Sequence, residues 1–258
     1  LEYDAAGRQT KVVLNCASGS SSSSSSSSSG GCPESDDVNM TVLTAYNGDG
    51  NVSSLTANNG STGNQTTQFV YGTTLDDSDI ASSLLKVAEI YPDSVDDDDR
   101  ITFQYNRQRQ VKQVTDQNGT VHAFDFDKLG RMTQDRVTTL GTGVDGAIRR
   151  IASSYEVRGM RTKLTSWNGE TVGSGSVVND VQFTYNDFAQ LIADYQAHGG
   201  SVSTSTTPKV QYGYASGSAN TIRPTSLTYP NARVLNYDYS TAGSIHDAIS
   251  RVDAIKDG

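Results

Sequence analysis

The chain has 258 residues and a formal net charge of −9 at pH 7, because 29 acidic residues outnumber 20 basic ones. This excess of acid argues against a nucleic-acid partner, which would need a surplus of Lys and Arg on one face. Only 34% of the residues are hydrophobic, so the composition suits a single curved layer rather than a thick core. No apolar run approaches the roughly 20 residues that a membrane span needs.

The first predicted element is a β-hairpin around the hexapeptide that begins Tyr3-Asp4 and ends Gly7-Arg8. The aromatic residue favours a strand, the short acid can bond nearby backbone groups to open a turn, and the glycine can adopt a positive φ. Alternation of apolar and polar residues resumes after the turn and continues to Leu14. The sequence therefore predicts strand, turn, strand.

Cys16 and Cys32 then bracket a run of ten serines from Ser20 to Ser29. Such a run cannot bury enough apolar surface to fold, so residues 16–32 are expected to be a loop insertion. A disulfide between the two cysteines would close this loop and contribute about 3 kcal/mol in the chain-entropy account. The alternative is a pair of buried or free thiols.

Residues 40–71 are expected to form further strands, with a second copy of the turn between Tyr46 and Gly50. Residues 79–87 are predicted to be a short helix, because Asp79 can cap it while Ile80, Leu84 and Val87 share one helical face.

Two clusters of aspartates, at residues 76–79 and 93–99, are candidate Ca²⁺ ligands by residue type. Neither cluster has the spacing of a dedicated calcium loop. We expect both to be solvated loops, and we expect no cofactor.

The repeat pattern is densest from Ile101 onward. Arg109 and Ala189 stand where glycine is expected, so either those two turns use another geometry or the copies are assigned incorrectly. The residues that carry the signature in the whole chain are Tyr3, Asp4, Gly7, Arg8, Tyr46, Gly50, Phe126, Asp127, Gly130, Arg131, Tyr155, Gly159, Tyr185, Tyr237 and Asp238.

These aromatic-Asp-x-x-Gly-Arg copies resemble the YD repeats of the Rhs (rearrangement hotspot) family over nearly the whole chain, and the part from Ile101 to Ile255 looks most like long bacterial, planctomycete-type Rhs proteins. The family includes polymorphic toxins, the shell of insecticidal toxin complexes and the teneurins. The resemblance implies an all-β array of successive antiparallel hairpins that forms one coiled sheet, as a spiral shell, tube or fibre. Residues 1–258 are then one array, expected to be an excerpt of a longer, exported chain.

The search for catalytic chemistry is negative. The three histidines lie in different repeats, and neither a phosphate-binding loop nor a nucleophile elbow is present. We therefore expect no catalytic, cofactor or metal site. The thirteen tyrosines follow the repeat, which favours a structural ladder over a ligand-binding surface.

Three functions remain open at this point. The first is a secreted or cell-surface structural protein that assembles into a shell, tube or fibre, with further repeats or identical copies as partners. The second is a segment of the encapsulating shell of a polymorphic toxin whose effector lies outside this chain. The third is an adhesion module that binds glycans.

Overall fold

The computed structural model describes residues 1–14, 40–59, 63–92, 94, 98–216 and 222–258. In this part of the chain 18 strands form an open antiparallel sheet in which each strand pairs with the next one along the sequence. The predicted all-β array of hairpins is thus confirmed. The strands are β1 (Glu2–Tyr3), β2 (Gln9–Leu14), β3 (Met40–Tyr46), β4 (Val52–Asn58), β5 (Gln65–Thr73), β6 (Ser82–Ile90), β7 (Arg100–Tyr105), β8 (Val111–Thr115), β9 (Val121–Phe126), β10 (Met132–Thr139), β11 (Arg150–Tyr155), β12 (Arg161–Trp167), β13 (Val177–Tyr185), β14 (Leu191–His198), β15 (Lys209–Tyr214), β16 (Pro224–Thr228), β17 (Val234–Asp238) and β18 (Ala254–Asp257).

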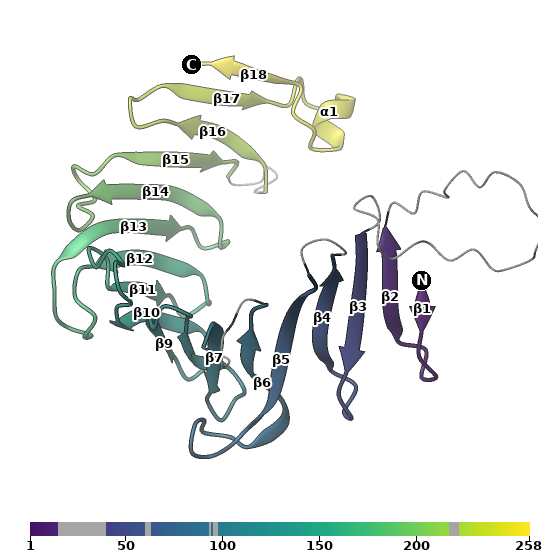
Figure 1. Cartoon of the computed structure of the whole chain (residues 1–258). Coiled ribbons are helices and arrows are strands. Elements are labelled where there is room, and N and C mark those ends of the chain that lie inside the picture. Colours follow the sequence, from purple (N-terminus) through teal and green to yellow (C-terminus); the bar gives the residue numbers. More distant parts are fainter. Residues whose placement is uncertain (15–39, 60–62, 93, 95–97, 217–221) are drawn as a thin grey trace, which may run out of the picture. The chain divides into compact units, whose positions relative to one another are not determined.

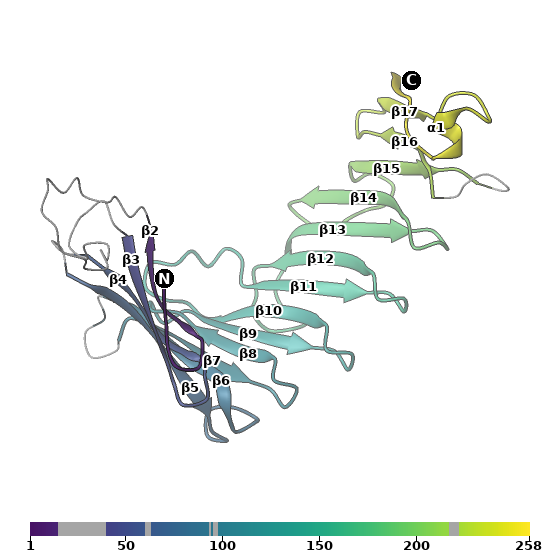
Figure 2. The same cartoon turned by 90° about the vertical axis from the view of Figure 1, so that its right-hand side faces the viewer.

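The chain divides into two compact units. Unit 1 comprises residues 1–123 and 139–144, and unit 2 comprises residues 124–138 and 145–258. Within each unit the strands follow one another side by side in chain order (Figures 1 and 2). Because every neighbour in the sheet is a neighbour in the sequence, no strand has to cross over another.

The aromatic residue at the end of a hairpin's first strand lies at a shift in register. Tyr46 faces Val52 while Ala45 faces Ser54, so one residue of β4 has no counterpart in β3. The same shift occurs at Tyr3, Tyr105, Tyr155 and Tyr185. Each is a β-bulge, which locally disrupts the ladder and strengthens the twist of the strand.

Few side chains in the described residues are buried. The apolar ones are Ala88, Ile90 and Tyr105 in unit 1, and Ala193 and Tyr195 in unit 2. Most strand residues are half-buried, as expected for a single sheet that is open to solvent on both faces. The low hydrophobic fraction of the sequence therefore matches its architecture.

The helix predicted at residues 79–87 is wrong. Residues 82–90 form β6, which pairs with β5 on one side and β7 on the other. Leu84 and Val87 do have helical spacing. Hydrogen bonding to strands on both sides nevertheless stabilises this segment more than a short isolated helix would.

One short helix appears where none was predicted. It is α1 (Ile245–Ala248), in the connection between β17 and β18, and the side chain of Ser244 caps it by accepting from the backbone N–H of Asp247. No helix in the described residues is long and apolar enough to cross a membrane. Cys16, Cys32 and the serine run lie outside the described residues.

A buried carboxylate anchors a loop in unit 2. Asp180 on β13 is fully buried and accepts hydrogen bonds from Lys163 (2.7 Å), Thr165 (2.6 Å) and the backbone N–H of Val202 (2.9 Å). Burial alone would raise the pKa of Asp180, but these three donors hold it below its usual value. The loop that follows β14 is thereby tied to the face of β12 and β13.

Candidate functional site

A five-residue turn recurs through the array and forms its principal repeated site. The first residue donates its backbone N–H to the carbonyl of the fifth residue at 2.8–3.0 Å, and the fourth residue donates back to the carbonyl of the first at 2.9–3.1 Å. The fourth residue has a φ between 62 and 93°. In the described residues this turn opens at Asp4, Asn47, Asn106, Asp116, Asp127, Glu156, Asn186 and Tyr229.

The short acid or amide at the first position is a local cap for the turn. In the six copies that open with Asp or Asn, one side-chain oxygen accepts from the backbone N–H groups of the third and fifth residues at 2.7–3.1 Å. These two bonds satisfy backbone donors that the hairpin ladder cannot reach. Glu156 opens its turn without this pattern, and its carboxylate instead pairs with Arg158.

In four of the eight turns, those that open at Asp4, Asn106, Asp127 and Asn186, the fifth residue matches the first in its chemistry. Where Asp opens the turn with Arg at the fifth position, the guanidinium Nε donates to the second carboxylate oxygen at 2.7 Å, as in Asp4–Arg8 and Asp127–Arg131. Where Asn opens the turn with Gln at the fifth position, the two amides bond instead, as in Asn186–Gln190 at 2.7 Å. Charge is paired with charge and amide with amide.

The backbone N–H of the fifth residue is the main cause that lowers the pKa of the opening carboxyl below its usual value, in Asp4 and in Asp127 alike. The guanidinium of the same residue adds to the effect. Both carboxyls are therefore charged in the folded chain at neutral pH.

The aromatic residue connects one hairpin to the previous one. Tyr46 donates its hydroxyl to the carbonyl of Gln9 at 2.8 Å, and Arg8 lies over the Tyr46 ring at 4.5 Å from its centre. Tyr155 repeats both contacts in unit 2, with the carbonyl of Met132 at 3.0 Å and with Arg131 at 4.5 Å. The acid, the arginine and the next tyrosine thus form one continuous chain of contacts.

The positive φ expected at Gly7, Gly130 and Gly159 is present. The expectation for Arg109 and Ala189 was wrong, since both occupy the same turn at φ values of 62 and 64°. Their turns close with the same backbone hydrogen bonds as the glycine turns, so the strain of a side chain at positive φ is offset by the rest of the turn.

Two turns of this kind open without a preceding aromatic residue, at residues outside the signature set that the sequence predicted. Asp116 opens one after a threonine rather than an aromatic residue, and at Tyr229 the aromatic residue itself is the first position. Conversely, Tyr237 and Asp238 precede no such turn, because the longer connection with α1 follows them. The pKa of Asp238 is lowered first by its bond with Lys256.

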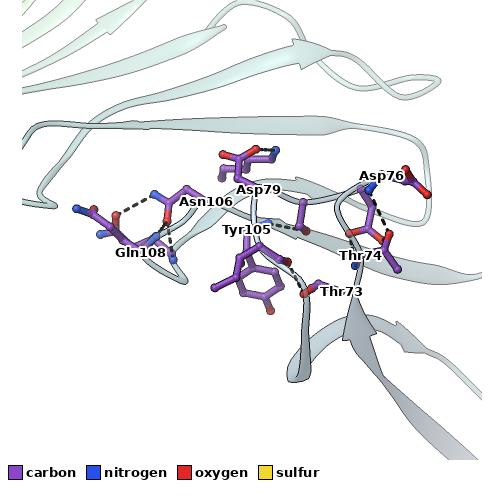
Figure 3. A network of polar contacts seen from close by, with 12 residues as sticks. Thr73, Thr74, Asp76, Asp79, Tyr105, Asn106 and Gln108 are labelled. Atoms are coloured by element: carbon purple, nitrogen blue, oxygen red, sulfur yellow. Dashed lines mark hydrogen bonds and ion pairs between the residues drawn. The ribbon is translucent and has the colours of Figure 1, made fainter.

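The connection between β5 and β6 replaces the five-residue turn with a longer loop (Figure 3). Thr73 donates its hydroxyl to the carbonyl of Ile80 at 2.7 Å, while Ser78 accepts from the backbone N–H of Tyr105 at 3.0 Å. Asp79 donates its N–H to the carbonyl of Tyr105 at 2.8 Å. The loop is thereby fastened to the end of β7.

Two of the acids in this loop are engaged within the protein. Asp79 pairs with Lys112 at 2.6 Å, and Asp77 accepts from the hydroxyl of Thr74 at 3.0 Å. No group of three His, Cys, Asp or Glu side chains that could hold a metal ion occurs in the described residues.

A hollow on one face of β14 and β15 in unit 2 is lined by aromatic residues. Its lining includes Phe188, Ile192, Tyr212 and Tyr214. Asp194 follows Ile192 by two residues and so lies on the same face, where burial raises the pKa of its carboxyl. Alternation along β14 and β15 brings Ile192, Tyr212 and Tyr214 to one face of the sheet, whereas Phe188 reaches the hollow from the turn that precedes β14.

No family model matches the sequence, and no curated protein matches it. Among solved structures, the chain is similar to a TcdB2–TccC3 protein without its hypervariable C-terminal region, with a TM-score of 0.58 and 12% identity over 99% of this chain and 12% of the other. A complex of TcdB2–TccC3 with Cdc42 gives 0.52 and 13% over 80% of this chain and 10% of the other. The likeness shows an Rhs-like fold, and the chain spans about a tenth of those proteins.

The turn geometry predicts opposite effects for substitutions at its fourth position. Replacing Gly130 by Val puts a β-branched residue at a φ of 78° and should lower the free energy of unfolding by about 1–2 kcal/mol. Ala189→Gly makes the reverse change in another copy of the turn and should raise the free energy of unfolding by about 1 kcal/mol. Urea denaturation measures both, and equal stability of Gly130→Val and the parent would contradict the assigned turn.

The lowered pKa of Asp127 predicts a pH-dependent contribution. Its stabilisation is complete above the carboxyl's ordinary pKa and is lost as the pH falls through the lower folded pKa. Asp127→Ala should therefore lower the melting temperature at pH 7 and have a much smaller effect at about pH 2.

Asn186→Ala is the matched control, because its amide makes the same two backbone bonds and does not titrate. Its effect on the melting temperature should persist at both pH values. A pH-independent effect of Asp127→Ala would show that the ionised carboxylate is not what stabilises the turn.

Proposed function

We propose that this chain is a structural wall segment of an exported β-repeat shell, that it performs no catalysis, and that its partners are further repeats or identical copies. The observation that supports this most is the contact chain from Asp4 and Arg8 to Tyr46, repeated from Asp127 and Arg131 to Tyr155. At both places it joins a hairpin to the next one and uses the signature residues for cohesion.

The likeness to the TcdB2–TccC3 proteins favours a shell over a free fibre. Under this proposal the chain contributes part of the enclosing wall of a toxin-like protein, and an effector would be supplied by sequence outside these 258 residues. An enclosing wall has to be continuous, so under this proposal the chain must join further hairpins at its edges.

The outer edge of β18 provides the test of continuity. In the described residues β18 pairs with β17 alone. The N–H group of Gly258, directly after β18, points toward β17 and donates to the carbonyl of Val234 at 2.9 Å. By the alternation of an antiparallel ladder, the backbone of Ile255 points away from β17 and is available to a further strand.

We expect the purified chain to associate through this edge, giving species larger than a monomer in light scattering and sheets or tubes in electron microscopy. Ile255→Pro removes an outward N–H and should shift the chain toward monomers without loss of folding. Lys256→Pro, on the inward-facing neighbour, should instead disrupt the hairpin. A parent chain that stays monomeric, with a freely exchanging Ile255 amide, would refute edge-to-edge assembly.

Glycan binding is a second proposal, favoured by the aromatic hollow on β14 and β15. Tyr212 and Tyr214 offer flat apolar rings beside polar Asn186 and Asp194, a combination suited to a sugar's apolar face and hydroxyls. A peptide cannot add here as a strand, because both edges of β14 and of β15 are already paired.

A glycan array with the parent chain should then give reproducible binding that Tyr212→Ala weakens at least tenfold. Val157→Ala, at a fully exposed position away from the hollow, should bind as the parent does. Absence of binding, or equal binding by Tyr212→Ala, would remove the adhesion function from consideration.

A further inference from the structure

Arg150 on β11 is a buried cation in unit 2. The residue is 3% exposed. Its Nη2 donates to the carbonyl of Ser174 at 3.1 Å, and its guanidinium stacks on Trp167 at 4.6 Å from the ring centre. Burial, and next the charge of Arg136, lower the pKa of Arg150 below its usual value. The charged form is therefore held in unfavourable surroundings.

No carboxylate among the described residues pairs with Arg150. The nearby acids are engaged elsewhere or face away. Asp125 accepts two bonds from Arg136 at 2.8 and 3.0 Å, and Glu170 pairs with Arg149. Asp135 faces Ile151 and thus lies on the opposite face of the sheet.

One further acid shares the face of Arg150. Asp180 lies on it, but its donors are Lys163, Thr165 and the N–H of Val202. The positive charge of Arg150 is consequently not balanced by the protein in its described part.

Three buried polar atoms on neighbouring strands have no hydrogen-bond partner in the described chain. They are Gln134 Oε1 on β10, Arg150 Nε on β11 and Trp167 Nε1 on β12. The register brings their residues to one face, since Arg136 faces Arg150 and Arg150 faces Trp167, while Gln134 precedes Arg136 by two residues. Buried polar atoms are rarely left unpaired, so three unpaired atoms on one face of three neighbouring strands point to a ligand.

We propose that Arg150, Trp167 and Gln134 bind a small inorganic anion of the chloride type between β10, β11 and β12. Two of the three unpaired atoms are N–H donors, and the amide of Gln134 becomes a third donor when its oxygen and nitrogen exchange places. A water molecule would satisfy the donors but would leave the buried charge unbalanced. A bulky anion would have to open the sheet to reach atoms that are fully enclosed.

The anion would also fix the loop of residues 168–176. Arg150 holds the Ser174 carbonyl, and the N–H of Ser176 is bound by the side chain of Asn168 at 2.7 Å. Neutralising the guanidinium would lower the cost of burying it beneath this loop. The site would therefore act as a structural anion site inside the sheet.

The test exchanges the purified chain into sodium gluconate and adds sodium chloride or bromide at constant ionic strength. The melting temperature should rise to a plateau with either halide. The rise should vanish in Arg150→Met, and Trp167→Phe, which keeps the aromatic ring and removes its N–H, should raise the half-saturating concentration several-fold. Arg233→Met, at an exposed ion pair with Asp257, is the matched control and should respond to halide as the parent does.

A crystal grown in bromide should show anomalous density beside Arg150 Nε and Trp167 Nε1. The proposal is overturned if no such density appears, or if the halide response is unsaturable or unchanged in both variants. If Arg150→Met does not fold, the outcome rests on Trp167→Phe and the bromide crystal, since an unchanged response and an absent peak would then refute the site.

Discussion

The contact on which the array depends is the one between a turn and the tyrosine of the following hairpin. A β-hairpin in isolation is marginally stable, so each unit has to gain stability from its neighbours. Arg8 holds Asp4 at 2.7 Å and covers the ring of Tyr46, whose hydroxyl meets the carbonyl of Gln9 next to the turn. Turn capping and hairpin stacking are thus performed by the same few side chains, which explains why they recur together in the sequence.

A single layer imposes a second constraint. In the part of the chain that the structure describes no second layer covers the sheet, so apolar burial per residue stays small and polar contacts carry more of the specificity. The carboxylates and amides that open the turns provide these contacts without needing a core. This is how a chain with a 34% hydrophobic fraction forms a continuous sheet.

The fold was predictable from sequence because its signal is local and repeated. Period-two alternation and the Asp-x-x-Gly spacing identify a hairpin wherever they occur. The failures also have physical causes. Residues 82–90 carry helical spacing, and their strand pairing depends on partners in β5 and β7. Arg109 and Ala189 adopt a positive φ because the opening asparagine caps the turn whichever residue stands fourth. The partner of each tyrosine hydroxyl could not be inferred, since it depends on the bulge and twist of the preceding hairpin.

Two loops of unit 2, after β12 and after β14, are held to the sheet by buried charged side chains rather than by apolar packing. The loop after β14 is tied through Asp180, and the loop after β12 through Arg150, with both residues almost completely enclosed. A thin sheet has little apolar surface to hold a loop, whereas one buried ionic group can bind several backbone atoms with defined geometry. The cost is desolvation, which Lys163 offsets for Asp180. Arg150 lacks an equivalent protein partner among the described residues, and that asymmetry between two otherwise similar anchors is the reason to look for an anion beside it.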